Sequence, residues 1–206
     1  MKTGKFITLE GIEGVGKTTH LGFIAARLKA MGHPVLVTRE PGGTSAGESI
    51  REILLHGKDI KIDPMTELLL IFAARAQHLQ EVVRPALAAG TIVLCDRFTD
   101  ASYAYQGGGR GMADTDIWIL EKLVQQELQP DLTFLFDASV QTGLARANKR
   151  SEADRFETET VGFFDRVRQT YLDRAHKEPG RFKIINGEQT LTAIEQDINR
   201  ILEVGL

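Results

Sequence analysis

The chain has 206 residues, of which 42% are hydrophobic and 26% charged, and its formal net charge is −3 at pH 7. This length suits one α/β domain with a substantial core, and we expect residues 1–206 to form a single domain. The slightly acidic balance excludes a surface built to grip nucleic acid or an anionic membrane, so any phosphate-binding cluster of cations must be local.

The single cysteine, Cys95, excludes an intramolecular disulfide and fits a reducing compartment. It lies in an apolar run, where we expect it to pack as a small buried side chain. The sequence contains no uncharged run of about 18 residues, the length that spans a bilayer, and its first residues lack the apolar core of a signal peptide. We therefore expect a cytoplasmic protein with no membrane partner.

The first predicted elements are an apolar strand over Lys5–Glu10 and an amphipathic helix over Thr18–Met31. Residues 11–18, which lead from this strand into this helix, read Gly-Ile-Glu-Gly-Val-Gly-Lys-Thr. They match the pattern G-x-x-x-x-G-K-[ST] at every fixed position. Such a loop directs backbone N–H groups and a helix N-terminus at a polyphosphate. Lys17 would reach the β- and γ-phosphates, and the Thr18 hydroxyl would ligate Mg²⁺. The candidate nucleotide-binding residues are Gly11, Ile12, Glu13, Gly14, Val15, Gly16, Lys17, Thr18 and Thr19.

Further apolar runs, each next to turn residues, predict strands over Pro34–Thr38, Thr91–Cys95, Leu132–Asp137 and Phe182–Asn186. The segment Gly47–Ala89 has room for two helices, and the second begins with Asp63 as N-cap and Pro64 at the first helical position. The alternation predicts a three-layer α/β/α fold of the P-loop NTPase class, with a five-stranded parallel sheet flanked by helices. Ligands of such sheets bind beyond the carboxyl ends of the strands.

The second strand is followed by Arg-Glu-Pro-Gly-Gly, in which Glu40 and Pro41 precede two glycines. This segment is either an ordinary turn or a tight path that holds a charged pair beside the ligand. Arg51 follows on the next helix, where its guanidinium would point into the same cleft or into solvent.

The third strand ends in Asp96-Arg97. An apolar run that ends in aspartate is the Walker-B arrangement, in which the carboxylate supports Mg²⁺ directly or through water. Arg97 next to it makes sense if a second phosphate group is held there bidentately, and the alternative is a structural salt bridge.

Aromatic, amide and hydroxyl side chains then precede a triple glycine. Ser102, Tyr105 and Gln106 suit recognition of a flat polar ring, unless the segment is only a flexible glycine-rich connection. On the helix from Pro64, Phe72 precedes Arg75 by three residues, so a base could lie on the apolar surface while the guanidinium meets a carbonyl on its edge.

The helix after the fourth strand runs into a basic segment that includes Arg146 and Arg150. Its cations are mixed with acids. This segment is either an exposed charged helix end or a lid whose arginines close over a transferring phosphoryl group.

Taken together, these segments resemble the thymidylate kinases, a family of P-loop nucleoside monophosphate kinases. The resemblance covers essentially the whole chain in order. It is carried by Leu9–Thr19, Thr38–Thr44, Phe72–Arg75, Asp96–Phe98, Tyr105–Gly111, Pro130–Thr133 and Asp154–Glu157. It implies transfer of the γ-phosphoryl of ATP to dTMP with Mg²⁺, as a step of dTTP biosynthesis. It also implies a homodimer formed by helices beside the sheet.

The resemblance also implies roles for individual residues. Arg97 and Arg51 would hold the dTMP phosphate, Arg75 would meet a thymine carbonyl, and Glu13 would lie near the acceptor. The remaining candidates for dTMP binding are Glu40, Pro41, Phe72, Ser102, Tyr105 and Gln106, while Thr18 and Asp96 would serve the metal and Arg146 the adenine.

The resemblance further implies the subtype in which the lid, about residues 146–157, supplies a catalytic arginine. The phosphate loop has no arginine at its variable positions, whereas the lid has Arg150. Lys17, Arg97 and Arg150 are then the catalytic candidates. One departure concerns Ile71, because many relatives have an aromatic side chain four residues before the thymine-binding arginine.

Two alternatives stay open from the sequence. A small GTPase needs a guanine-reading Asn-Lys-x-Asp and an Asp-x-x-Gly, but Asn148-Lys149 lacks the aspartate and no Asp-x-x-Gly occurs. A P-loop kinase with a different acceptor is the closer rival. Arg97 with Arg51 favours an acceptor that already carries phosphate.

Overall fold

A computed structural model describes residues 4–56, 61–147, 155–156 and 158–205 of the chain. The described residues form a parallel sheet of five strands in the order β2-β3-β1-β4-β5. The strands are β1 (Phe6–Glu10), β2 (Val35–Arg39), β3 (Ile92–Asp96), β4 (Leu132–Asp137) and β5 (Phe182–Asn186). Every predicted strand is confirmed, with bounds that shift by at most one residue at each end.

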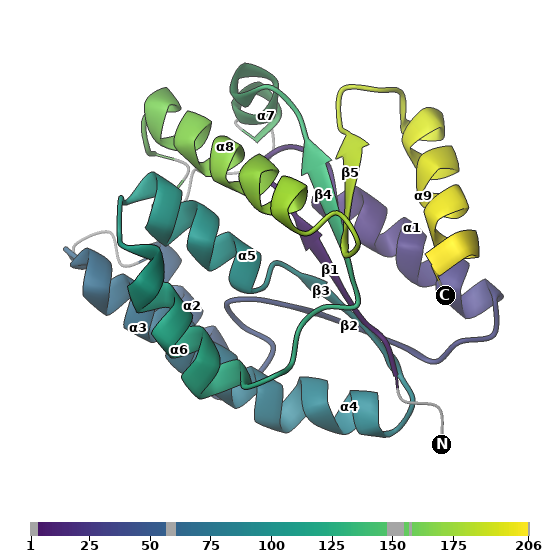
Figure 1. Cartoon of the computed structure of the whole chain (residues 1–206), viewed down its shortest axis with the longest axis horizontal. Coiled ribbons are helices and arrows are strands. Elements are labelled where there is room, and N and C mark those ends of the chain that lie inside the picture. The colour runs from purple at the N-terminus through teal and green to yellow at the C-terminus, as the bar shows by residue number, and fades with distance from the viewer. Residues whose placement is uncertain (1–3, 57–60, 148–154, 157, 206) are drawn as a thin grey trace.

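Helices cover both faces of the sheet, as the alternating pattern predicted (Figure 1). They are α1 (Lys17–Ala30), α2 (Ser45–His56), α3 (Pro64–His78), the π-helical η1 (Leu79–Val83), α4 (Arg84–Ala88), α5 (Thr99–Ser102), the π-helical η2 (Tyr103–Gly109), α6 (Asp114–Gln125), α7 (Val140–Ala147), α8 (Val161–Lys177) and α9 (Leu191–Gly205). Helices α1 and α9 lie together on one side of the strands, while α3, α4, α6 and α8 lie on the other (Figure 1).

In the residues that the structure describes, the segment between β2 and β3 forms two continuous helical stretches, as the sequence predicted. Asp63 caps α3 as expected, since its side chain accepts a hydrogen bond of 2.9 Å from the Met65 N–H. Instead of ending, α3 then continues through η1 into α4, which has Pro85 in its first turn. A proline inside a continuous helix lacks an N–H and crowds the preceding turn, and a π-helical segment accommodates this.

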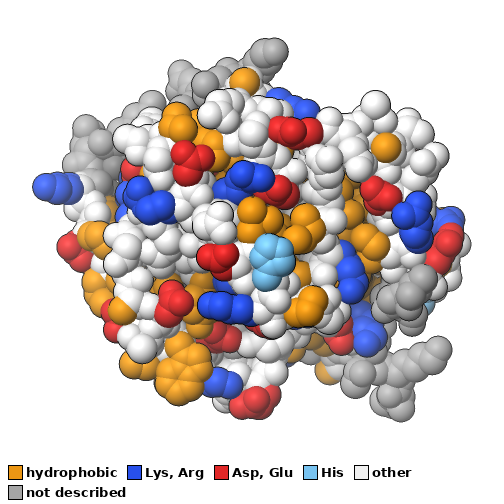
Figure 2. All heavy atoms as spheres, turned by 45° about the horizontal axis from the view of Figure 1, so that its top comes forward, with side chains coloured by type: hydrophobic (Ala, Val, Ile, Leu, Met, Phe, Trp, Pro, Cys, Tyr) orange, Lys and Arg blue, Asp and Glu red, His pale blue; other side chains and the backbone are white. Residues whose placement is uncertain are grey.

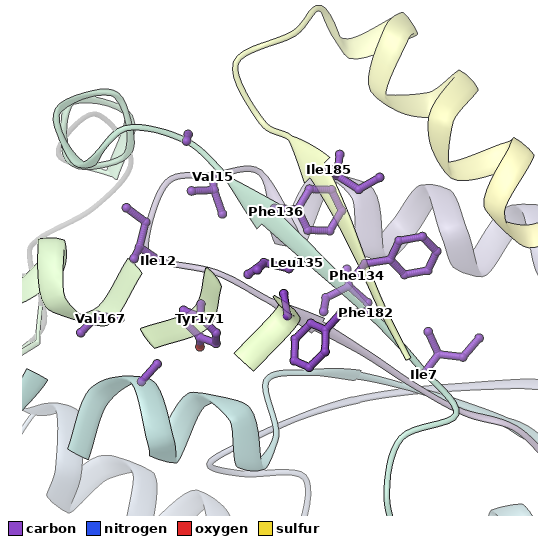
Figure 3. Packing of buried hydrophobic residues seen from close by; sticks show 14 of the residues in the cluster. Ile7, Ile12, Val15, Phe134, Leu135, Phe136, Val167, Tyr171, Phe182 and Ile185 are labelled. Atoms are coloured by element: carbon purple, nitrogen blue, oxygen red, sulfur yellow. The ribbon is translucent and has the colours of Figure 1, made fainter. Parts of the chain in front are cut away.

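The apolar core lies between the sheet and its helices. Figure 3 shows side chains of this core, among them Ile7, Phe134 and Ile185 on the strands and Val167 on α8. Strands β1, β3 and β4 are almost entirely buried, which explains their near-continuous apolar sequences. Cys95 on β3 is fully buried, as expected, and burial raises the pKa of its thiol. Among the described residues, no helix combines the length and apolarity needed to cross a membrane.

The triple glycine is part of a helix and is packed against α8. A Cβ atom on Gly108 would lie 2.1 Å from Thr170 Oγ1 and 2.9 Å from the Arg166 carbonyl oxygen. A Cβ atom on Gly109 would lie 2.5 Å from the Phe163 ring. The glycines therefore permit a close approach of η2 to α8, and the alternative of a flexible glycine-rich connection is wrong.

We predict that Gly108→Ala destabilises the protein by about 1–3 kcal/mol, because the added methyl group overpacks the contact with α8. The matched control is Gly22→Ala in α1, where a Cβ atom meets nothing within 4 Å. Alanine there should stabilise by up to about 1 kcal/mol through its higher helix propensity. Urea unfolding of both variants measures this, and equal effects of the same sign would contradict the packing account.

Candidate active site

The loops at the carboxyl ends of the strands surround a cleft of about 270 Å³. Most of the predicted site residues line it: Glu13, Gly14, Gly16, Lys17, Thr18, Glu40, Pro41, Arg51, Arg75, Asp96, Arg97, Ser102, Tyr105 and Gln106. Figure 2, in which the top of Figure 1 is turned toward the viewer, shows acidic and basic side chains interspersed over this part of the surface. The cations suited to bind phosphate form a local cluster in the cleft, as the net charge of −3 implied: Lys17, Arg51, Arg75 and Arg97.

The phosphate loop packs so closely on its neighbours that glycine is required at two positions. Gly11 and Gly14 have φ angles of 132° and 71°. Cβ atoms on them would lie 2.3 Å from the Phe136 carbonyl oxygen and 1.9 Å from the Gly143 carbonyl oxygen. The loop thus rests on the end of β4 and on α7, which holds its backbone N–H groups in place for a phosphate.

Lys17 is folded back over the loop that precedes it. Its ammonium donates hydrogen bonds of 2.9 Å and 2.7 Å to the carbonyl oxygens of Gly11 and Ile12. Burial, together with the nearby charge of Arg97, lowers its pKa to about 8, against the attraction of neighbouring carboxylates. An anionic polyphosphate in the loop would favour the charged form of this side chain.

Arg97 joins the two halves of the cleft. Its Nη2 donates to Glu13 Oε1 at 2.8 Å and its Nη1 to the Tyr171 hydroxyl at 3.3 Å, and its guanidinium lies 4.7 Å from the centre of the Tyr105 ring. Burial opposes its charge, but Tyr105 and Glu13 outweigh this and raise its pKa. Its φ angle of 69° is unusual for a non-glycine residue, and such backbone strain clusters at functional sites.

Asp96 and Thr18 both lie on the cleft, at the position predicted for the metal. Asp96 Oδ1 is buried and has no hydrogen-bond partner in the part of the chain that the structure describes. Within those same residues, no group of three or more His, Cys, Asp or Glu side chains gathers to hold an ion. A buried carboxylate oxygen with unused acceptor capacity, on the same cleft as the Thr18 hydroxyl, fits Mg²⁺ that takes its other ligands from phosphate and water.

The opposite end of the cleft is built around Arg75, of which only 1% is exposed. Its Nε donates to Glu40 Oε2 at 2.7 Å and its Nη2 to Ser102 Oγ at 3.1 Å, whereas its Nη1 is buried without a partner among the described residues. Glu40 is also bonded to His78 Nδ1 at 2.9 Å. The guanidinium is therefore held rigidly, with one donor left for a ligand.

The structure distinguishes the two apolar side chains before Arg75. Ile71 lines the cleft, whereas Phe72 does not. Phe72 packs with Leu68, Tyr103 and Ile117, and the Arg75 guanidinium lies 4.5 Å from the centre of its ring. Phe72 therefore supports Arg75 from behind, and the structure gives no support to a contact between Phe72 and a ligand in the cleft.

The Pro-Gly-Gly segment follows the tight path that the sequence suggested. Gly42 and Gly43 have φ angles of 139° and 79°. Arg51 Nη1 donates to the Pro41 carbonyl oxygen at 2.9 Å, so the helix arginine is drawn toward the cleft rather than left in solvent.

The other predicted site residues lie off the cleft or outside the described part. Arg146 Nη1 donates to the Gly187 carbonyl oxygen at 2.8 Å, which places it beside the loop after β5. Arg150 lies outside the described residues. Gly11, Ile12, Val15 and Thr19 belong to the loop and α1 but do not line the cleft. Cleft residues that the sequence analysis missed include Leu54, Leu55, Phe98, Ala101 and Phe156, which carry only the ordinary signal of apolar residues.

A buried acid behind the cleft was also missed. Glu10 Oε1 accepts a hydrogen bond of 2.7 Å from the Phe98 N–H, and Oε2 accepts one of 2.8 Å from the Tyr171 hydroxyl. Burial and the nearby charge of Asp100 raise its pKa to about 8. Asp100 is itself bonded to Arg174 and Arg181, each at 2.6 Å.

The raised pKa of Glu10 makes stability depend on pH. Because the folded state holds this proton up to about pH 8 and the unfolded state loses it near 4.5, folding becomes less favourable as pH rises between those values. We predict that Glu10→Gln flattens this dependence by a few kcal/mol, since one unit of pKa shift corresponds to about 1.4 kcal/mol. Urea unfolding at pH 5, 6.5 and 8 tests it, and parallel pH profiles for variant and wild type would contradict the assignment.

Comparisons with known proteins agree with this geometry. A family model described as thymidylate kinase matches residues 9–198. The thymidylate kinases of Pseudomonas syringae pathovar tomato and Ectopseudomonas mendocina are each 56% identical over 200 residues, which cover 97% of this chain and 95% of theirs. The crystal structure of the thymidylate kinase from Ehrlichia chaffeensis superposes with a TM-score of 0.80 at 33% identity, covering 98% of this chain and 99% of that one. Because the family model spans residues 9–198 and relatives that are 56% identical cover 97% of the chain, the chain belongs to the thymidylate kinase family.

Proposed function

We propose that the cleft binds MgATP at the phosphate loop and dTMP at the arginines beyond it. As a member of this family, the chain phosphorylates dTMP to dTDP with ATP, and we propose that the reaction depends on Mg²⁺. The observation that carries the proposal is the continuity of the cleft. It joins the phosphate loop at Lys17 to the spare donor of Arg75 through Arg97. Such a cleft presents groups suited to a triphosphate, an acceptor phosphate and a base, in that order.

Lys17 and the loop N–H groups would hold the β- and γ-phosphates of ATP. Thr18 and Asp96 would hold Mg²⁺, which when bound neutralises charge on the phosphates. The hydrogen bonds from the Lys17 ammonium to the Gly11 and Ile12 carbonyl oxygens support this role, because they hold the charge against the phosphate loop.

The acceptor half would be held by arginines. Arg97 and Arg51 would bind the phosphate of dTMP, and no general base is needed because a phosphate monoester with a second pKa of about 6 is largely dianionic at neutral pH. Glu13, already bonded to Arg97, would keep that guanidinium aimed at the phosphate. Catalysis then consists of positioning and charge neutralisation.

The base would be read at the Arg75 end. The partnerless Nη1 of Arg75 would donate to a thymine carbonyl, with Ser102, Tyr105 and Gln106 around the ring. Glu40 and Pro41 would form the wall below. Ile71, rather than Phe72, supplies the apolar contact at this end. A cytosine amino group would face the donor of Arg75, so discrimination against cytosine should exceed that against uracil, which lacks only a methyl group.

We further propose that residues 146–157 act as a lid that supplies Arg150, and that Arg146 contacts the adenine. Two contacts support this: Phe156 at the end of the segment lines the cleft, and Arg146 at its start donates to the loop after β5, where the adenine would bind.

We also propose a homodimer and a cytoplasmic location. Helices α3 and α6 pack side by side and expose apolar side chains, namely Met65, Leu69, Trp118, Ile119 and Leu123, which a second copy would cover. A monomer in sedimentation equilibrium at micromolar concentration would contradict the dimer.

The proposed cytoplasmic location rests on the single cysteine, Cys95, which is buried and suits a reducing compartment.

The test of the function is ADP release from MgATP with dTMP, dUMP, dCMP, AMP or GMP as acceptor. We expect strong stimulation by dTMP and weaker stimulation by dUMP, since a methyl group contributes only about 1–3 kcal/mol. The other acceptors should have almost no effect. Stronger stimulation by another monophosphate would overturn the assignment of the base site.

For the lid, we predict that Arg150→Ala lowers turnover on the order of 10³-fold, by analogy with arginines that stabilise the charge of phosphoryl transfer. Binding of dTMP, measured by calorimetry, should change little. Arg166→Ala is the control, since Arg166 lies on α8 and bonds to the Gly108 and Gly109 carbonyl oxygens. Unchanged turnover with weakened dTMP binding would contradict the catalytic role of Arg150.

A further inference from the structure

A buried carboxylate that does not itself line the cleft is bonded to a side chain that does. Glu67 lies in the first turn of α3 with 1% of its surface exposed. Its Oε1 accepts a hydrogen bond of 2.8 Å from Gln106 Nε2. Gln106, on η2, is itself 1% exposed and lines the base end of the cleft. The contact therefore links a side chain of the base site to an acid behind it.

The chemistry of this bond determines which way the Gln106 amide lies. An ionised carboxylate has only acceptors, so the amide must turn its nitrogen toward Glu67. The amide oxygen then lies at the other end of the planar group. An amide without such a neighbour can exchange its two ends at little cost, and with them its donor and acceptor.

Two arginines hold Glu67 in place and compensate its charge. Arg155 Nη2 donates to Oε2 at 2.5 Å, and Arg110 donates from Nε to Oε1 and from Nη2 to Oε2, each at 3.3 Å. Arg155 is anchored in turn through its Nε, which donates to the Leu54 carbonyl oxygen at 2.8 Å. A buried acid with these partners is fixed in position. Because burying its charge costs desolvation free energy, we expect a function to depend on its position.

We propose that Glu67 is a positioning residue that makes the cleft specific for thymine. This rests on the proposed function. By fixing the amide nitrogen of Gln106, Glu67 leaves the amide oxygen to accept a hydrogen bond from the N3–H of the base. The cleft then presents the amide oxygen of Gln106 as an acceptor, beside Arg75 Nη1 as a donor.

That pattern distinguishes the pyrimidines. Thymine has a donor at N3 beside an acceptor at O4, which complements it. Cytosine has an acceptor at N3 beside an amino donor, so both contacts would be mismatched. Buried polar groups left without partners carry a large penalty, which is the basis of strong discrimination.

The test exchanges the two side chains. Glu67→Gln replaces a side chain that only accepts by one that also donates, so the Gln106 amide is no longer held in one orientation. This should raise KM for dTMP about tenfold, the effect of one lost hydrogen bond. Gln106→Glu places two carboxylates at the 2.8 Å contact and should be more harmful. The exchange variant Glu67→Gln/Gln106→Glu restores the pattern, because the amide introduced on α3 donates to the new carboxylate on η2, whose other oxygen accepts from N3–H. Its KM for dTMP should fall below that of both single variants, with KM for ATP unchanged throughout.

The matched control is Glu121→Gln. Glu121 is another buried acid that accepts from a glutamine amide, Gln129 Nε2, but this glutamine does not line the cleft. The control should leave KM for dTMP unchanged. If Glu67→Gln does not fold, as judged by circular dichroism, the comparison of Gln106→Glu with the exchange variant decides alone.

Two results would overturn the proposal: an exchange variant no better than Gln106→Glu, or a Glu67→Gln variant that folds and matches the control. A wild-type protein that releases no ADP in response to dTMP would instead refute the proposed function. The two failures are therefore distinguishable.

Discussion

The position of the partly buried Arg97 guanidinium at the carboxyl end of β3 is the constraint on which the rest of the site depends. A cation largely shielded from water requires partners, and this one takes them from the phosphate loop (Glu13), from η2 (Tyr105) and from α8 (Tyr171). These elements are far apart in the sequence, and this side chain joins all three. The backbone N–H of Arg97 also donates to the Leu9 carbonyl oxygen at 3.0 Å, which ties the strained residue to β1.

The same principle recurs around the cleft. Glu40 orients Arg75, Glu67 bonds to Gln106, and Glu10 accepts from the backbone of the segment after Arg97. Each acid is buried, and each holds a group that faces or supports the cleft. A protein of net charge −3 thereby concentrates cations for phosphate in one place. Donors that are rigid before the substrate arrives lose little entropy when it binds.

Much of the fold could be predicted because its signals are local. The strands are short apolar runs next to turn residues, and the phosphate loop is a spaced motif whose glycines are required by close backbone contacts at Gly11 and Gly14. Asp96 and Arg97 were found because they follow a strand in a sheet whose ligands bind at that edge.

Other features depend on tertiary contacts that a pattern does not contain. Ile71 and Phe72 are neighbours on a helix, and only the packing of α3 against η2 and α6 decides which one faces the cleft. Glu10 and Glu67 read as ordinary charged residues, since nothing local indicates their burial. The triple glycine gave no sign of a helix because its role is to let α8 approach.

The central claim is that the acids around the cleft, Glu13 and Glu40, hold the Arg97 and Arg75 guanidinium groups in place before substrate binds. A crystal structure with dTMP and a non-hydrolysable ATP analogue tests it most directly. The account predicts the dTMP phosphate about 3 Å from Arg97 and a thymine carbonyl about 3 Å from Arg75 Nη1. The bonds from Arg97 to Glu13 and from Arg75 to Glu40 should be unchanged. A complex in which either arginine leaves its carboxylate to reach dTMP, or in which the phosphate binds away from Arg97, would contradict it.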